Sequence, residues 1–211
     1  MTSSHELVRE PQQARSRKSF DRAVDAALAL LVERGTPSFT LVEVSKRAGV
    51  STGSMYGRVA SKDDLIRVAH AREMERLSAQ TSASFASLPA DVTDTERIEL
   101  AITALANLLQ ENAPVLSPFM LLANQDAVIA EAGKAAYDAM NREFERAMVG
   151  SAAATVSKRR AVRWSCTVVY SVLARQLALG SDPGAAADYD LDQVIDELVA
   201  MTSAYLAHAG T

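Results

Sequence analysis

The chain has 211 residues, enough for one large domain or two small ones, and 48% of them are hydrophobic, enough for a packed core. Its single cysteine, Cys166, excludes an intrachain disulfide and fits a reducing compartment. The first twenty residues lack the apolar run of a secretory signal, and no uncharged stretch approaches the ~20 apolar residues that cross a bilayer. We therefore expect a globular, cytoplasmic protein with no membrane partner.

Charge is divided unevenly along the chain. Residues 1–62 hold ten Lys and Arg against six Asp and Glu, a net charge of +4. Residues 63–67 contribute −1 and residues 68–211 contribute −7, so the whole chain carries −4. The basic N-terminal part favours nucleic acid as its partner, because phosphate binding depends on clustered Lys and Arg.

Apolar residues recur at three- and four-residue spacing along nearly the whole chain, and no stretch alternates with a period of two. This periodicity predicts an all-α fold. Residues 1–15 have no apolar stripe and are expected to form a mobile arm, followed by a first helix at 16–34 that ends at Gly35. Side chains able to cap helices then stand at Thr40, Ser51 and Ser61, and Glu43 completes a capping box with Thr40.

The rest of the chain has room for long helices. The fourth helix is expected at 61–83, and a second capping box, Thr93 with Glu96, begins a fifth that ends near Pro114. A short apolar piece at 115–123 is followed by helices at 126–149, 157–179 and 191–207. The total is nine helices.

Residues 40–56 have the features of a helix-turn-helix, which needs two short helices, a tight turn and small residues where the helices cross. Ser45 is small enough for a close helix approach, and Gly49 can adopt the positive φ of the turn. The expected internal core consists of Val44, Ala48, Val50, Met55 and Val59.

Polar and basic residues cluster around the second of these helices. Hydroxyls and backbone amides that can face DNA are expected at its start, at Ser51, Thr52, Gly53 and Ser54. Side chains placed for phosphates are Tyr56, Arg58 and Lys62, with Lys46 and Arg47 adding positive charge. For Arg15, Arg17 and Lys18 in the N-terminal part, DNA contact and a solvated tail remain equally open.

These residues resemble the N-terminal motif of the TetR family of transcription regulators. The matching positions are Thr40, Val44, Ala48, Gly49, Val50, Ser51, Gly53, Met55, Tyr56, Val59, Ser61, Lys62, Asp63 and Leu65. The resemblance implies a DNA-binding domain at 16–62 and a helical ligand-binding and dimerisation domain at 63–211. It also implies phosphate contacts from Tyr56 and Lys62 and a DNA face that includes Thr40, with Thr52 and Ser54 as base readers. The alternative is that Tyr56 packs between helices and Lys62 only covers the surface.

Two positions depart from the family motif: Ser45 stands where alanine is usual, and Arg58 where histidine or tyrosine is usual. The function that the resemblance implies is a repressor that binds a palindromic, double-stranded DNA operator as a homodimer and is released by a small, largely apolar effector. The alternative is a helical dimer that binds a ligand or a protein and whose DNA binding is weakened, with these two departures as its support.

The last two helices carry apolar stripes that suit either an intramolecular core or a dimer interface, and the resemblance favours the interface. The expected interface residues are Val162, Val169, Leu173, Leu177, Leu191, Val194, Ile195, Leu198, Val199 and Tyr205. A ligand pocket, if present, is expected among the middle helices. Its candidate residues, each of which also suits a simple core, are Phe119, Met120, Asn124, Tyr137, Met140, Trp164 and Tyr170.

Nothing in the sequence favours an enzyme. The three histidines, His5, His70 and His208, are scattered, and neither a metalloprotease motif nor a glycine-rich phosphate loop is present. Cys166 has no sequence sign of an activating base and is better explained as a small buried hydrophobe. We therefore expect no catalytic residues, no metal and no cofactor.

Overall fold

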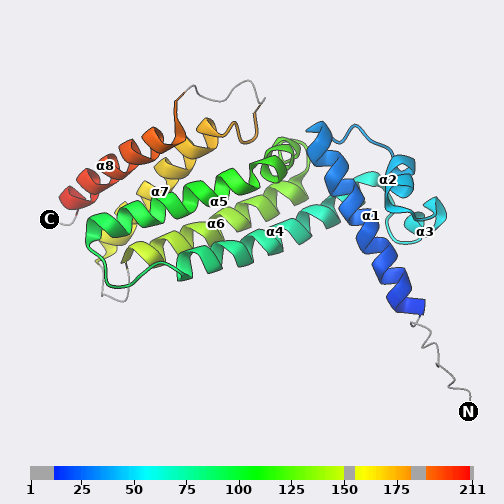
Figure 1. The fold of residues 1–211 in the computed structure, drawn as a ribbon, viewed down its shortest axis with the longest axis horizontal. Helices are drawn as coiled ribbons and strands as arrows, with labels where there is room; N and C mark the ends of the chain where they lie inside the picture. The colour runs from blue at the N-terminus through cyan, green and yellow to red at the C-terminus, as the bar shows by residue number, and fades with distance from the viewer. Residues whose placement is uncertain (1–11, 150–154, 182–188, 210–211) are drawn as a thin grey trace, which may run out of the picture. The chain divides into compact units, whose positions relative to one another are not determined.

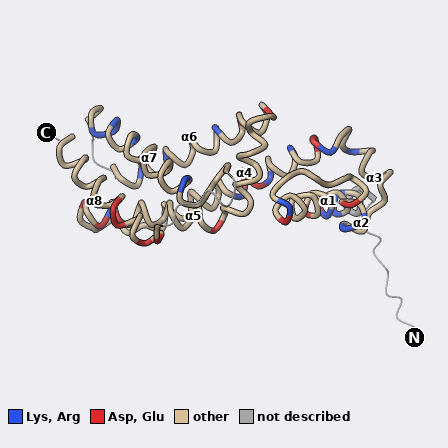
Figure 2. The backbone as a smooth tube through the Cα atoms, turned by 90° about the horizontal axis from the view of Figure 1, so that it is seen from above, with Lys and Arg blue, Asp and Glu red and all other residues tan. Residues whose placement is uncertain are grey.

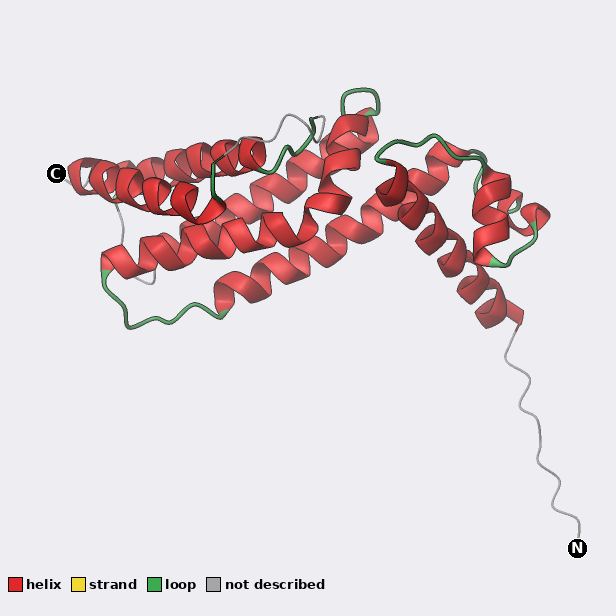
Figure 3. Ribbon diagram, turned by 45° about the horizontal axis from the view of Figure 1, so that its top comes forward, coloured by secondary structure: helices red, strands yellow, loops and turns green. Residues whose placement is uncertain are grey.

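The computed structural model of the protein describes residues 12–149, 155–181 and 189–209. Within these ranges every regular element is a helix, which confirms the predicted all-α fold (Figures 1 and 3). The helices are α1 (Gln12–Arg34), α2 (Leu41–Ala48), α3 (Thr52–Tyr56), α4 (Lys62–Ala86), α5 (Asp94–Leu122), α6 (Ala127–Val149), α7 (Val156–Gln176) and α8 (Leu191–Ala209). Along the described ranges none of them combines the length and the apolarity needed to cross a bilayer.

Contacts divide the chain into two compact units, Met1–Ala69 and His70–Thr211, called here the first and second unit. In the first unit α1 packs against α2, and α2 against α3. The small core beneath them contains Val24, Leu31, Phe39, Val44, Met55 and Leu65, each at most 3% exposed. Helix α4 begins in the first unit and continues into the second.

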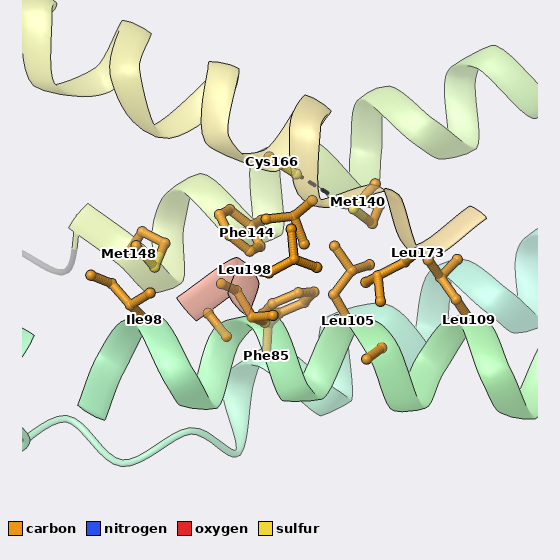
Figure 4. Close-up of a cluster of buried hydrophobic side chains, with 14 of the residues drawn as sticks. Phe85, Ile98, Leu105, Leu109, Met140, Phe144, Met148, Cys166, Leu173 and Leu198 are labelled. Carbon is orange, nitrogen blue, oxygen red and sulfur yellow. Dashed lines mark hydrogen bonds between the residues drawn. The ribbon is translucent and has the colours of Figure 1, made fainter. Parts of the chain in front are cut away.

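The second unit is a bundle in which α5 contacts α6, α7 and α8 (Figure 1). Its core is apolar and continuous, and Figure 4 shows Phe144 of α6 at its centre, facing Phe85 and the leucines of α5. The rings of Phe85 and Phe144 meet edge to face with centroids 6.1 Å apart. Cys166 is fully buried in the same core, and burial raises the pKa of its thiol to about 12, which fits the predicted inert role.

Both predicted capping boxes are confirmed. The Thr40 hydroxyl accepts from the Glu43 amide at the start of α2, and the Glu43 carboxylate accepts from the Thr40 amide. Thr93 and Glu96 make the same reciprocal pair at the start of α5. These bonds satisfy amide groups that a helix start otherwise leaves without partners.

Two boundaries differ from the prediction. Helix α1 begins at Gln12, so residues 12–15 are helical and do not belong to an arm, whereas residues 1–11 lie outside the described residues. Helix α5 runs without a break through Pro114 and Pro118, so the described part has eight helices where nine were expected. A proline inside a helix costs ~3 kcal/mol. The part of α5 beyond Pro114 buries Phe119, a burial worth ~1.5–3 kcal/mol.

Candidate functional site

The turn between α2 and α3 depends on a left-handed glycine. Gly49 has φ 62° and ψ 39°, as the sequence predicts for this turn. The Val50 amide then donates to the Ser45 carbonyl at 3.1 Å, closing the chain back on the end of α2. On the other side of the turn Ser51 caps α3, and its hydroxyl accepts from the Ser54 amide at 3.2 Å.

Ser45, the first departure from the family motif, joins the two helices through its hydroxyl. Its Oγ donates to the Val50 carbonyl at 2.5 Å and accepts from the Thr52 hydroxyl at 3.1 Å. Ser45 is only 5% exposed, so these bonds are largely shielded from water. The Thr52 hydroxyl proton is therefore engaged inside the unit, which leaves Thr52 less available for reading a base than the sequence suggested.

The remaining predicted DNA-facing residues lie mostly at the surface. The exposed ones are Thr40, Lys46, Ser51, Gly53, Ser54, Tyr56 and Arg58, while Thr52 and Lys62 are half-buried. Tyr56 ends the five-residue helix α3 with 58% of its surface exposed, so it does not pack between helices. Short polar side chains at the start of α3 and an exposed tyrosine at its end form a surface that can approach a DNA groove.

Arg58, the second departure, lies against α1. Its guanidinium donates to the Ser16 hydroxyl and stands 5.4 Å from the centre of the Phe20 ring. This cation–π contact orients the side chain, while a guanidinium has five N–H donors and can bind a phosphate at the same time.

Lys62 is held by the segment between α1 and α2. Its ammonium donates to the Pro37 carbonyl at 2.7 Å and lies 5.6 Å from the centre of the Phe39 ring. The Lys62 position is thus fixed by intramolecular contacts, with two of its three N–H groups still able to donate elsewhere.

The two basic residues near the end of α2 have different surroundings. Arg47 makes a two-bond ion pair with Glu33 of α1, with N–O distances of 2.6 and 2.5 Å, which offsets its charge. Lys46 is exposed and makes no ion pair with any described residue. Lys46 therefore contributes more of its charge to this surface than Arg47 does.

A cavity of about 520 Å³ lies in the second unit, lined by residues of α4, α5, α6 and α7. Its size is within the ~300–1,000 Å³ typical of small-molecule sites. Five of the seven residues expected at a pocket line it, namely Phe119, Met120, Tyr137, Met140 and Tyr170. Asn124 lies outside the lining because it is exposed just beyond the end of α5, and Trp164 lies outside because it faces solvent with 59% of its surface exposed.

The polar residues of the cavity lining include two tyrosines and His70. The rings of Tyr137 and Tyr170 meet edge to face at 4.9 Å, and the Tyr137 hydroxyl is hydrogen-bonded to Thr167 at 3.1 Å. Burial raises the pKa of Tyr170, with the neighbouring Tyr137 adding to the effect. His70 of α4 was not expected here, because a lone histidine in an amphipathic helix gives no sign of which neighbours it meets.

Four of the expected interface residues are buried within the chain itself, which corrects the prediction for them. Val162, Val169, Leu173 and Leu198 are at most 3% exposed and belong to the core of the second unit. Leu177, Leu191, Val194, Ile195 and Val199 are partly buried against that core. The spacing of an apolar stripe identifies a buried face but not whether its partner is the same chain or another.

A different set of apolar residues is exposed on α7 and α8, called here the outer face: Trp164, Val172, Met201 and Tyr205. Residues 164 and 172 lie two four-residue steps apart on α7, and residues 201 and 205 lie one such step apart on α8, so each pair shares a side of its helix. Trp164 and Tyr205 line the same shallow hollow, which makes the outer face continuous across the two helices. Tyr205 is the one residue of the expected set that is exposed.

Opposite charges flank the outer face. All the charged residues of α7 are basic, whereas those in the first half of α8 are acidic (Figure 2). Two of the arginines, Arg159 and Arg163, donate to the buried Glu145 of α6 at 3.2 and 2.6 Å. Burial alone would raise the pKa of Glu145, but the hydrogen bonds and charges of these arginines together lower it.

Comparisons with known proteins agree on one family. The family model described as "Bacterial regulatory proteins, tetR family" matches residues 23–69. The HTH-type transcriptional repressor KstR of Mycolicibacterium smegmatis is 32% identical over 148 residues, which cover 69% of this chain and 69% of that protein. KstR of Rhodococcus jostii is 31% identical over 133 residues, covering 60% of this chain and 58% of that protein.

Solved structures agree on the fold. A crystal structure from Mesorhizobium loti, named as a TetR-family transcriptional regulator, matches with a TM-score of 0.72 at 15% identity. The match covers 92% of this chain and 98% of that one. The helices therefore follow a known fold even where the sequences have diverged.

Proposed function

The chain belongs to the TetR family of DNA-binding transcriptional regulators, and from this membership we propose that it is a repressor that binds operator DNA as a homodimer and leaves it when an effector fills the cavity. Two relatives are named as repressors, which supports repression as the direction of regulation. The effector is a small, largely apolar molecule, because the cavity wall is predominantly apolar.

DNA is contacted by the exposed end of the helix-turn-helix. Ser54 and Gly53 at the start of α3 approach base edges, and Tyr56, Lys46 and Arg58 bind phosphates. The exposure of these side chains supports this assignment. Since few of the groups near the bases have strong base preferences, sequence-dependent DNA shape contributes to specificity.

Dimerisation uses the outer face. It offers Trp164, Met201 and Tyr205 as exposed apolar anchors, and the basic α7 can meet the acidic α8 of a second copy. A two-fold arrangement satisfies both pairings at once, because each surface is used by both copies. The operator is then a palindrome whose half-sites are about one DNA turn apart, ~34–36 Å.

Helix α4 is the observation that carries the regulatory part of the proposal. Its first residues belong to the first unit, and from His70 to Ser82 it lines the cavity. An effector that binds the conformation unfit for DNA more tightly than the DNA-bound one shifts the population away from DNA. Helix α4, whose residues belong to both units, is the physical link proposed for that shift.

DNA binding is tested by selecting duplexes from a random-sequence pool and measuring affinity against salt concentration. We expect a palindromic site and an affinity that falls steeply with salt. Replacing Lys46 by alanine should lower the salt slope by ~1, because one phosphate contact is lost. Arg142→Ala on α6, an exposed cation outside this surface, is the matched control and should leave the slope unchanged. A salt-independent affinity would contradict the proposal.

Dimerisation is tested by sedimentation of Trp164→Ala. Central tryptophans of interfaces typically cost at least ~2 kcal/mol when truncated, so the dimer should dissociate at ~30-fold higher protein concentration. Val42→Ala, an equally exposed apolar residue on α2, should leave the assembly unchanged. Equal dissociation constants for both variants would place the interface elsewhere.

A further inference from the structure

The effector's chemistry can be narrowed from the shape and the polar groups of the cavity. We propose that the effector is an elongated, uncharged and mainly apolar molecule with a hydroxyl or carbonyl group at one end, and that His70 hydrogen-bonds this group. The inference rests on the proposed effector function and specifies the ligand that the cavity accepts.

The elongated shape follows from how far each helix lines the cavity. The lining spans His70–Ser82 on α4, Leu108–Met120 on α5 and Ile129–Glu143 on α6. With a rise of ~1.5 Å per residue, these segments extend over ~18–21 Å. A volume of about 520 Å³ distributed over that length suits a narrow molecule better than a compact one.

Apolar side chains form the wall along most of this length. From the His70 end onward the wall consists chiefly of Phe119, Ile129, Met120, Met74, Leu116, Leu77, Met140, Leu108 and Leu109. Burying apolar surface there stabilises a complex by ~25 cal/mol per Å² of surface removed from water. Most of the ligand is therefore hydrocarbon.

His70 stands at one end of the cavity and has an unused hydrogen-bonding capacity. It is 3% exposed, and its ring packs edge to face on Phe119 with centroids 4.7 Å apart. No described residue hydrogen-bonds to either of its ring nitrogens. A ligand group that bonds to this imidazole inside a largely apolar cavity gains affinity.

The polar groups toward the other end of the cavity already have partners. The Thr81 hydroxyl donates to the Leu77 carbonyl at 2.7 Å, and the Ser82 hydroxyl donates to the Glu143 carboxylate at 3.2 Å. Their hydrogen-bonding capacity is largely spent within the protein, so these two hydroxyls compete less than His70 for the ligand's polar group.

The charge of the lining excludes an ionised group next to His70. Burial lowers the pKa of His70, and the nearby Asp126 carboxylate opposes this shift only in part, so the imidazole is neutral at pH 7. The lining's lysine, Lys134, already pairs with Asp138 at 2.7 Å. A carboxylate placed at His70 would be buried without a countercharge. An ammonium would meet an Asp126 carboxylate that already accepts from the Val128 and Ile129 amides, whereas a hydroxyl or carbonyl needs no countercharge.

The test uses three probes with one chain length: dodecanol, dodecanoate and dodecylamine. Their affinities are measured by calorimetry with wild-type protein, His70→Leu, His70→Gln and the matched control Thr81→Val, which alters a cavity hydroxyl that is already bonded. We expect wild type to bind dodecanol most tightly and the two charged probes at least ~10-fold more weakly. His70→Leu should weaken dodecanol ~3–10-fold. Thr81→Val should change it less than twofold, and His70→Gln, which keeps a donor and an acceptor, should restore most of the loss.

Three results would overturn the inference: dodecanoate or dodecylamine binding as tightly as dodecanol, equal losses in His70→Leu and Thr81→Val, or no binding of any probe. Operator release is measured separately on the same samples. If dodecanol binds through His70 and the operator stays bound even with the cavity saturated, the release mechanism fails while the assignment of His70 stands. If a screened effector releases DNA equally from wild type and His70→Leu, the assignment of His70 fails and the release mechanism stands.

Discussion

The two units of this chain are stabilised by different kinds of interaction. In the first unit the helices of the DNA-binding motif are only eight and five residues long, well below the ~12–15 residues at which isolated helices become stable. The Thr40 and Ser51 hydroxyls accept from backbone amides at the helix starts, and the Ser45 hydroxyl donates to the Val50 carbonyl in the turn between the helices. In the second unit the helices are long, and a continuous apolar core aligns them.

The proposed DNA-binding surface lies on the outside of the first unit, whereas the proposed ligand site is a cavity inside the second. In the first unit, structural residues and residues proposed to face DNA alternate along the chain: the Ser51 hydroxyl caps α3, whereas the exposed Ser54 and Tyr56 are proposed to meet DNA. In the second unit the proposed ligand site lies inside, and Met140 belongs both to the core and to the cavity wall. A substitution in the first unit can therefore affect DNA binding with little loss of stability, whereas one in the second unit tends to affect stability and ligand binding together.

The largest expected effect is that of Phe144→Ala in the second unit. Phe144 is fully buried at the centre of the core, and removing such a ring typically costs ~3–5 kcal/mol of unfolding free energy. Urea denaturation measures this loss. Val128→Ala on the same helix, where the side chain is 55% exposed, is the control and should stay within ~0.5 kcal/mol. Similar values for both variants would mean that the core is not the main stabilising element of this unit.

Each unit has a capping box, so the effect of losing the same kind of cap can be compared between the two units. Thr40→Ala and Thr93→Ala remove the same cap, and each should cost ~1 kcal/mol of stability. The eight-residue α2 has few other bonds to hold its first turn, whereas the 29-residue α5 is held by the core. Hydrogen exchange should therefore quicken at the α2 amides in Thr40→Ala, with operator affinity falling ~5-fold or more, a factor that corresponds to ~1 kcal/mol.

Thr93→Ala is the control for this experiment and should leave operator affinity within twofold. Thr40→Ser, which keeps the capping hydroxyl, should retain both the slow exchange and the affinity. If Thr93→Ala weakened DNA binding as much as Thr40→Ala, the contrast between short capped helices and long packed ones would not hold.

The helix-turn-helix could be predicted from the sequence because its determinants are local. A capping pair three residues apart, or a glycine that must take a positive φ, can be recognised without knowing the rest of the fold. The structure bears this out at Thr40, Glu43 and Gly49. The role of Ser45 could not be foreseen, since its bond to Thr52 depends on how closely α2 and α3 approach.

The cavity and the outer face could be predicted only in part, because they depend on contacts between distant segments. The apolar stripe of α7 suits a core and an interface equally well, and the structure buries Val169 while it exposes Trp164. From the sequence, the prolines of α5 predict a break in the helix, because each of them removes a backbone hydrogen bond. Here α5 continues past both prolines, and Phe119 beyond them is buried in the second unit.

The smallest expected effect concerns the negative charge of Glu43. The Glu43 carboxylate links α2 to α1 through its ion pair with Arg34. A hydrogen bond from Arg34 at 2.6 Å, together with bonds from the Thr40 amide and hydroxyl, lowers the pKa of this carboxyl from 4.5 to about 2. Because the folded pKa is depressed, the stabilisation is fully present above pH 4.5 and is lost as the pH falls toward 2. The Glu43 side chain is 43% exposed to solvent, so the effect is modest and screened by salt.

Glu43→Gln isolates this charge, because glutamine can still complete the capping box. At pH 7 the variant should melt slightly below wild type, and the difference should shrink as the pH falls from 4.5 toward 2. Glu96→Gln provides the comparison in the second unit, since the pKa of Glu96 is lowered by its Thr93 cap without help from an arginine. The Glu96→Gln difference should therefore be smaller at pH 7 and less sensitive to salt. A Glu43→Gln difference that stays constant down to pH 2 would show that the carboxylate charge does not stabilise the first unit.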